Sequence, residues 1–246
     1  MRQDARSIVI TLVLSFCVTA SHAQQPDPFG AGRPDSGGRP AAETERADPA
    51  PLSGQVDERL KEADSVTYRL APGSRLQVQT GKSGLFGFAG HSHVIRARAF
   101  HGQVVYYPKT PSSSHLDITV VADSLEVLTP PDTAEIRKVT AAMRDEVLRT
   151  AEYHEIRLVS RQVTPRANGF HLVGALTLVG QTREVPIDIA VRIGVDTLEA
   201  TSTFSVKQTD FGIKPYSGGP GGTVKVADRV TFEIDAIGVR AEAKSP

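Results

Sequence analysis

The most regular pattern in the sequence lies within residues 168–195, where apolar and polar residues alternate in two consecutive runs. In the second run, every other residue from Val185 to Ile193 is apolar, and the residues between them are polar or small. This period of two is typical of a strand with one buried and one exposed face. Gly180 stands where the chain must reverse. We therefore predict a β-hairpin of two long strands, joined by residues 180–183.

The same alternation recurs along residues 65–240. It predicts further strands at residues 66–70, 76–80, 96–107, 116–120, 155–163, 196–206 and 230–236. Between them, clusters of Pro, Gly, Asp and Ser predict loops or turns at residues 123–131, 165–169, 209–216 and 217–222.

Residues 133–149 have a different period, because their apolar side chains recur at spacings of three to five. These side chains are Ile136, Val139, Met143, Val147 and Leu148. Such spacing places them on one face of an amphipathic helix. Since most connections between the predicted strands are short, we expect an antiparallel sheet, and closing it into a barrel removes its edges. The expected fold is mainly β, an antiparallel barrel of about eight strands with one main α-helix.

The beginning of the chain has a different character. Two arginines precede an apolar run from Ile8 to Val18, and the small residues Ser21 and Ala23 follow. This order is typical of a secretory signal peptide over residues 1–23, cleaved near Ala23. The apolar run is too short to cross a hydrocarbon core of ~30 Å, which needs about 20 residues. We therefore expect a periplasmic or secreted protein whose mature form has no integral membrane span.

Residues 24–64 are rich in Pro, Gly, Asp and Arg, a composition that predicts a disordered linker. This leaves residues 65–240 as one β-barrel domain. Cys17 is the one cysteine of the sequence, so the mature chain would contain neither a disulfide nor a catalytic thiol. The 28 Lys and Arg residues balance 28 Asp and Glu residues, so the charge gives no indication of a nucleic-acid partner.

Two histidines, His91 and His93, are the best candidates for catalysis. Side chains two residues apart on a strand point the same way and could share a metal ion, although the sequence identifies no third ligand. Alternatively, they are polar lining or form a turn after Gly90. The triplet at residues 81–83 lacks the upstream glycine of a phosphate loop, and the triplet at 210–212 lacks the partners of a kinase site. We therefore expect no enzyme and keep a metal site at His91 and His93 as the alternative.

Two longer motifs have a specific order and spacing: Gly174-Ala-Leu-Thr-Leu-Val-Gly180 is followed 29 residues later by Thr209-Asp-Phe-Gly-Ile213. Shorter motifs accompany them at residues 68–74, 86–88, 100–102, 122–125, 143–148, 153–156, 160 and 226–230. Together these motifs, over residues 66–239, resemble the YceI-like family of exported bacterial proteins. His154 and Lys207-Gln208 depart from the usual pattern of that family.

The resemblance implies a lipocalin-like barrel with a helix at one end. It also implies an apolar cavity that holds a polyisoprenoid chain, such as a prenyl lipid or a quinone, for transport or storage and without another cofactor. Two alternatives remain: a metal- or His-dependent enzyme that uses His91 and His93, and a stress-response interaction module with a filled core. The oligomeric state stays open, with a homodimer as one option.

The expected lining of the cavity consists of apolar side chains on the inward faces of the strands, on the helix and in the aromatic stretch at residues 86–88. Small residues are common on these faces and the chain has no tryptophan, which is compatible with an open interior. The candidate lining residues are Phe86, Phe88, Phe100, Met143, Leu176, Leu178, Ile187, Ile189, Leu198, Ala200, Phe204 and Phe211.

Overall fold

The computed structural model describes residues 60, 63–83, 92–128, 133–218 and 224–242. The predicted signal peptide and nearly all of the predicted linker lie outside the described residues, as do Phe86, Phe88 and His91.

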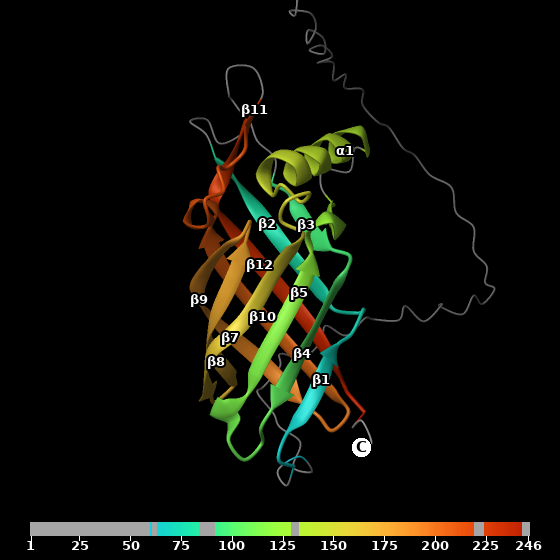
Figure 1. Ribbon diagram of the computed structural model, residues 1–246, viewed down its shortest axis with the longest axis vertical. Helices are drawn as coiled ribbons and strands as arrows, with labels where there is room; N and C mark the ends of the chain where they lie inside the picture. The colour runs from blue at the N-terminus through green and yellow to red at the C-terminus, as the bar shows by residue number, and fades with distance from the viewer. Residues whose placement is uncertain (1–59, 61–62, 84–91, 129–132, 219–223, 243–246) are drawn as a thin grey trace, which may run out of the picture. The chain divides into compact units, whose positions relative to one another are not determined.

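The described residues form strands, one α-helix and several short helical turns (Figure 1). The strands are β1 (Val66–Leu70), β2 (Arg75–Ser83), β3 (Val94–Ala97), β4 (Phe100–Tyr106), β5 (His115–Val121), β6 (Leu125–Val127), β7 (Glu155–Arg166), β8 (Gly169–Leu178), β9 (Gln181–Ile193), β10 (Thr197–Lys207), β11 (Ser217–Gly218) and β12 (Val224–Arg240). The helical elements are η2 (Pro111–Ser113), η3 (Ala122–Ser124), α1 (Thr133–Ala142), η4 (Met143–Val147) and η5 (Gln208–Phe211).

The sheet closes on itself because β1 pairs with both β4 and β12. Three positions around the barrel are each occupied by two successive strands, β1 with β2, β3 with β4, and β5 with β6. Both strands of each couple have neighbours at the same two positions. β1 and β2 both pair with β12. β4 pairs with β1 and β5, and in the same way β3 pairs with β2 and β6. The result is a closed antiparallel barrel of eight strand positions with one α-helix, which confirms the predicted fold.

Several predicted boundaries shift. The strand predicted at residues 96–107 is interrupted at Arg98 and Ala99, whose backbone N–H groups donate to the carbonyl and the hydroxyl of Ser124. The loop predicted at 123–131 accordingly contains part of η3 and all of β6. The turn predicted at 165–169 is shorter, because Pro165 and Arg166 still pair with β8.

The β8–β9 hairpin turns within two residues. Val179 and Gly180 both have positive φ angles, 47° and 70°, and Leu178 pairs directly with Gln181. Two positive φ angles are typical of the tight turns that match the twist of hairpin strands. The predicted four-residue connection is therefore wrong, since residues 181–183 already belong to β9.

The predicted helix over residues 133–149 ends earlier as an α-helix and continues as a π-helical turn. In this turn the N–H of Leu148 donates to the carbonyl of Met143, five residues back, over 2.8 Å. The wider turn keeps both side chains packed on the barrel. The five-residue spacing between Met143 and Leu148 in the sequence matches the i→i+5 hydrogen bond of a π-helical turn.

The described residues form three core clusters. One, next to α1, includes Leu76, Val127 and Met143. A second, at the β8–β9 turn, includes Leu178 and Phe211. The third groups Leu60, which precedes β1, with side chains of β1, β4, β9 and β10: Val66, Tyr68, Tyr106, Val191, Ile193 and Leu198. Within the part of the chain that the structure describes, no helix has the length and hydrophobicity needed to cross a membrane.

Candidate functional site

An apolar cavity of about 70 Å³ lies inside the barrel. Aliphatic side chains from both sides of the barrel surround it, and β10 contributes small residues. The lining includes Leu116, Ile118, Leu158, Ile187, Ile189, Leu198, Ala200, Ser202, Phe204, Ile234 and Ala236. Such an interior can take an aliphatic chain but offers it few polar partners.

The barrel is tightly closed at the β9–β10 turn. Tyr68 is fully buried there, and its hydroxyl donates to the carbonyl of Gly194 over 2.6 Å. Gly238 packs beside it, and a Cβ at this position would lie 2.9 Å from the Cβ of Tyr68. Because the glycine allows this close approach, the tyrosine ring fills the end of the barrel below the cavity.

The opposite end of β10 is closed by η5. Phe211 is 1% exposed in the cluster at the β8–β9 turn, and Gly212 ends the turn with a φ of 71°. The carboxylate of Asp228 accepts hydrogen bonds from the backbone N–H and the hydroxyl of Thr209, over 2.9 and 2.8 Å. These bonds lower the pKa of Asp228 below its ordinary value. The side-chain amide of Gln208 donates to the carbonyl of Ala227 over 2.8 Å, so η5 is fixed to the bulge of β12.

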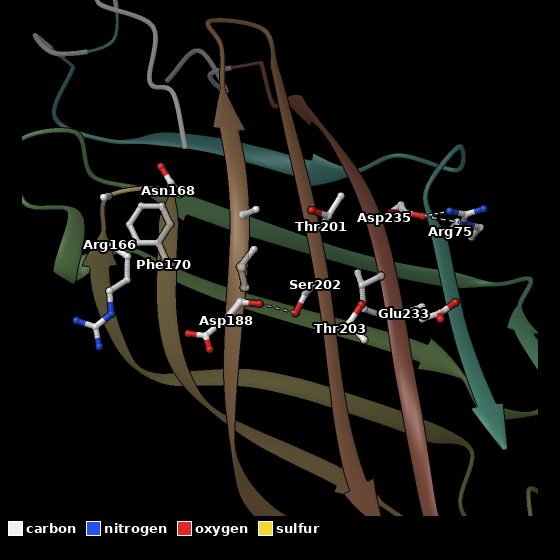
Figure 2. Close-up of a pocket in the computed structure, with 14 residues that line it drawn as sticks. Arg75, Arg166, Asn168, Phe170, Asp188, Thr201, Ser202, Thr203, Glu233 and Asp235 are labelled. Atoms are coloured by element: carbon white, nitrogen blue, oxygen red, sulfur yellow. Dashed lines mark hydrogen bonds and ion pairs between the residues drawn. The ribbon is translucent and has the colours of Figure 1, made fainter. Parts of the chain in front are cut away.

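The wall beside the cavity is incomplete. β9 and β10 pair only where residues 190–193 face residues 198–201. Beyond Ala190 and Thr201 the two strands diverge, as Figure 2 shows. There the hydroxyl of Ser202 donates to the carbonyl of Asp188 over 2.7 Å. We call the region between residues 181–189 of β9 and residues 202–207 of β10 the β9–β10 split.

A groove of about 660 Å³ lies on the outer face of this split. Charged, hydroxyl and amide side chains line it (Figure 2). They are Arg75, Arg166, Asn168, Asp188, Thr201, Thr203, Glu233 and Asp235. Ile189, Ser202 and Ile234 belong to the lining of both the groove and the inner cavity. The two spaces therefore adjoin each other across the split.

The predicted cavity residues fall into three groups. Ile187, Ile189, Leu198, Ala200 and Phe204 line the cavity. Others pack in the core clusters outside its lining, and these are Phe100, Met143, Leu176, Leu178 and Phe211. Phe86 and Phe88 lie outside the described residues.

Of the two histidines of the alternative metal site, the structure describes His93. His93 is half-buried, and its backbone pairs with Thr80 through bonds of 2.9 and 3.0 Å. Among the residues that the structure describes, no cluster of three or more His, Cys, Asp or Glu side chains could hold a metal ion. Because His91 is not among them, its pairing with His93 stays a hypothesis.

The other shifted pKa values belong to groups outside the cavity lining. Burial raises the pKa of Tyr106, and the guanidinium of Arg157 lowers the pKa of the Asp117 carboxyl, to which it donates over 2.9 Å. The first pKa shift follows from the burial of Tyr106 and the second from the ion pair of Asp117 with Arg157, and both groups lie on strands of the barrel.

The split was not predicted from the sequence, although Pro186 indicates that pairing between β9 and β10 is interrupted. This proline lies in the part of β9 that has no β10 partner. Since proline cannot donate to a ladder, it is largely confined to edge strands and bulges. Proline inside the alternating run of β9 therefore indicates that the strand loses one neighbour.

A closed antiparallel barrel around an apolar interior defines this protein as one of the lipocalin-like β-barrel proteins. Within that class, the chain belongs to the YceI-like family, whose YceI-like domain matches residues 71–237. A comparison with curated proteins found no match.

Two solved structures have a similar fold. BcnA of Burkholderia cenocepacia is 16% identical with a TM-score of 0.53, over 67% of this chain and 95% of that chain. A polyisoprenoid binding domain from Saccharophagus degradans, implicated in plant cell wall breakdown, is 14% identical with a TM-score of 0.51, over 72% of this chain and 99% of that chain. At these identities the similarity establishes the fold.

Proposed function

We propose that this protein binds the chain of a polyisoprenoid lipid, such as a prenyl lipid or a quinone, inside its barrel, and that it transports or stores this lipid outside the cytoplasm. The observation that carries the proposal is the apolar cavity between the closed end at Tyr68 and η5. The fold is shared with a polyisoprenoid binding domain, which supports the same class of ligand.

The physical chemistry of the interior favours binding over catalysis. Each buried CH₂ group contributes about 0.8 kcal/mol, so one five-carbon isoprene unit contributes roughly 4 kcal/mol before losses. Aliphatic residues such as Ile187, Ile189 and Leu198 supply that kind of contact. A protein of this kind needs no catalytic residue. The signal-peptide pattern of residues 1–23 supports a periplasmic or secreted location.

One observation favours the alternative of an interaction module with a filled core. The cavity measures about 70 Å³, whereas pockets for small ligands usually hold ~300–1,000 Å³. A prenyl chain therefore requires the wall to move apart.

Mass spectrometry of an organic extract separates these functions. The protein is exported in its natural host, purified without detergent and extracted, and we expect a prenyl chain in about one copy per barrel. An extract without prenyl lipid, from protein that also takes up none when it is added, contradicts the proposal. Stoichiometric metal lost in a His91→Gln/His93→Gln variant would favour the enzyme instead.

A further inference from the structure

The β9–β10 split is the place where the barrel can widen. β9 pairs with β8 along residues 181–189, and β10 pairs with β12 along its whole length. Between β9 and β10 themselves, backbone pairing covers four residue pairs and stops at Ala190 and Thr201. Separating these strands further breaks the side-chain hydrogen bond from Ser202 to Asp188 but no backbone ladder. Movement here costs less than at a continuous ladder.

The cavity and the outer groove meet at this split. Ile189 and Ser202 stand on its two sides and line both spaces. The cavity behind them is about 70 Å³ and the groove in front is about 660 Å³. A chain that pushes these residues apart passes from the groove directly into the apolar interior.

The groove has the chemistry of a site for a polar but uncharged group. Three carboxylates, those of Asp188, Glu233 and Asp235, outnumber two guanidinium groups. Arg75 and Asp235 offset each other, since the Nε of Arg75 donates to Asp235 over 2.7 Å. The carboxylates of Asp188 and Glu233 then remain with the single guanidinium of Arg166, and Asp188 also lies 2.7 Å from Nδ1 of His171. A pyrophosphate would meet unfavourable like charges here. A hydroxyl or a quinone carbonyl can instead hydrogen-bond to side chains such as Thr201 and Asn168.

We propose that the lipid chain enters the barrel sideways through the β9–β10 split, and that the outer groove holds its uncharged head group. The inference rests on the proposed binding of a polyisoprenoid chain. It places the hydrophobic part of the ligand against Ile189, Ala200 and Phe204, and the polar part between β9 and β12 on the outer face.

A cross-link over the split tests the entrance. Asp188 and Thr203 both face outward, one on each side, so an Asp188→Cys/Thr203→Cys variant of the full chain is made with Cys17→Ser. The two thiols are joined by oxidation or by dibromobimane, and the bridge is verified by mass. The matched control is Arg192→Cys/Glu199→Cys, which bridges outward positions that already pair in the same two strands.

Uptake of tritiated farnesol is followed by rapid gel filtration. The bridge over the split should slow uptake at least about tenfold relative to the reduced variant, while the control bridge changes it less than about twofold. Equal rates in the bridged and reduced variants overturn the side entrance. Failure of the parent protein to take up farnesol at all contradicts the binding function instead, so the two failures are distinguishable.

The head-group site is tested with two probes that share one chain. Farnesol should bind at least about tenfold more tightly than farnesyl pyrophosphate, because the pyrophosphate faces the carboxylates of the groove. An Asp188→Asn/Glu233→Gln variant should reduce this preference. The control Glu199→Gln removes an exposed carboxylate of β10 outside the groove and should leave the preference unchanged. Tighter binding of the pyrophosphate, or an unchanged preference in the double variant, overturns the assignment.

Discussion

The two halves of the β9–β10 hairpin have the same alternating sequence pattern but different structures. Near the turn, Ile193 and Leu198 are almost fully buried against Tyr68, and the strands pair residue by residue. In the other half the strands lack a common ladder, and Ile189 and Phe204 beside the cavity are only partly buried. Farther from the ladder, Val185, Ile187 and Val206 are again buried, in the cluster around Phe211. The paired half closes the barrel at Tyr68, and both halves line the cavity, Leu198 and Ala200 from the paired half and Ile187, Ile189 and Phe204 from the unpaired half. The inward residues are thus less buried where the ladder ends beside the cavity than at the closed end near Tyr68.

Two features separate the strands in the second half. Pro186 removes a backbone donor from β9 in this region. At the same end, η5 follows β10. Phe211 and Ile213 pack there in one cluster with Ile187 of β9 and Val206 of β10. The hydrogen bonds of Asp228 with Thr209 keep η5 in that position. The separation of β9 and β10 is therefore maintained by the packing of η5 and does not result from fraying at a strand end.

The largest effect should come from a charge placed in the paired half. Ile193→Asp buries a carboxylate at a site that is 2% exposed and should cost at least about 4 kcal/mol of unfolding free energy. Ile189→Asp, at the partly buried wall, should cost only about 1–2 kcal/mol, because water reaches it through the groove. Urea unfolding followed by circular dichroism measures both. Equal costs would contradict the difference between the closed end and the cavity wall at Ile189, and Asp188→Asn, on the outer face, is the mild control.

Filling the cavity should affect binding more than stability. Ala200 lines the cavity, so in Ala200→Phe the ring occupies the space of the ligand. We expect prenol binding to weaken at least about tenfold, with a stability loss near the lower end of the ~1–3 kcal/mol typical of overpacking. Titration with farnesol and thermal melts measure the two effects. A large loss of stability with unchanged binding would mean that Ala200 belongs to a solid core.

The sequence predicted the fold well because the barrel follows from local periodicity. Strands, short turns and one amphipathic helix can be identified from alternation and spacing. The interruption at Arg98 could not be identified in this way. It depends on Ser124, which is distant in sequence and accepts the hydrogen bonds of this bend. The π-helical turn was visible only as the five-residue spacing between Met143 and Leu148.

The site was harder to predict because the most recognisable motifs form the scaffold. Gly180 has no Cβ, and the ring of Tyr153 packs where a Cβ would lie, so two motifs contact each other. Thr209 and Asp228 join two more. Phe211 is part of this scaffold and lies outside the cavity lining. Residues that border the split, such as Ser202, carry no motif at all.

Acid should weaken the closure by η5. The pKa of Asp228 is lowered in the folded state, so its stabilising bonds to Thr209 are fully present above the unfolded pKa of about 3.9 and are lost as the pH falls through the lower folded value. Asp228→Asn should therefore be less stable than the parent at about pH 6, and the difference should shrink at about pH 2.5. Urea midpoints at the two pH values measure this. A difference independent of pH would assign the effect to packing.

The smallest effect should come from an exposed ion pair in the paired half. Arg192 and Glu199 face each other across β9 and β10 with both side chains about half exposed. Arg192→Ala should cost only ~0.2–1 kcal/mol, because solvent screens the charges. Urea unfolding provides the value. A cost above that range would mean that the pairing near the turn depends on this ion pair and not on the buried contacts of Ile193.

The most direct measurement is photolabelling with a prenol that carries a diazirine in its chain. After irradiation, peptide mass spectrometry locates the modified residues. The account predicts labels on inward-facing cavity residues such as Leu198, Ala200 and Ile234, and their loss in Ala200→Phe. Labels confined to outward-facing residues such as Ile237 and Val239, unchanged in that variant, would contradict binding of the chain inside the barrel.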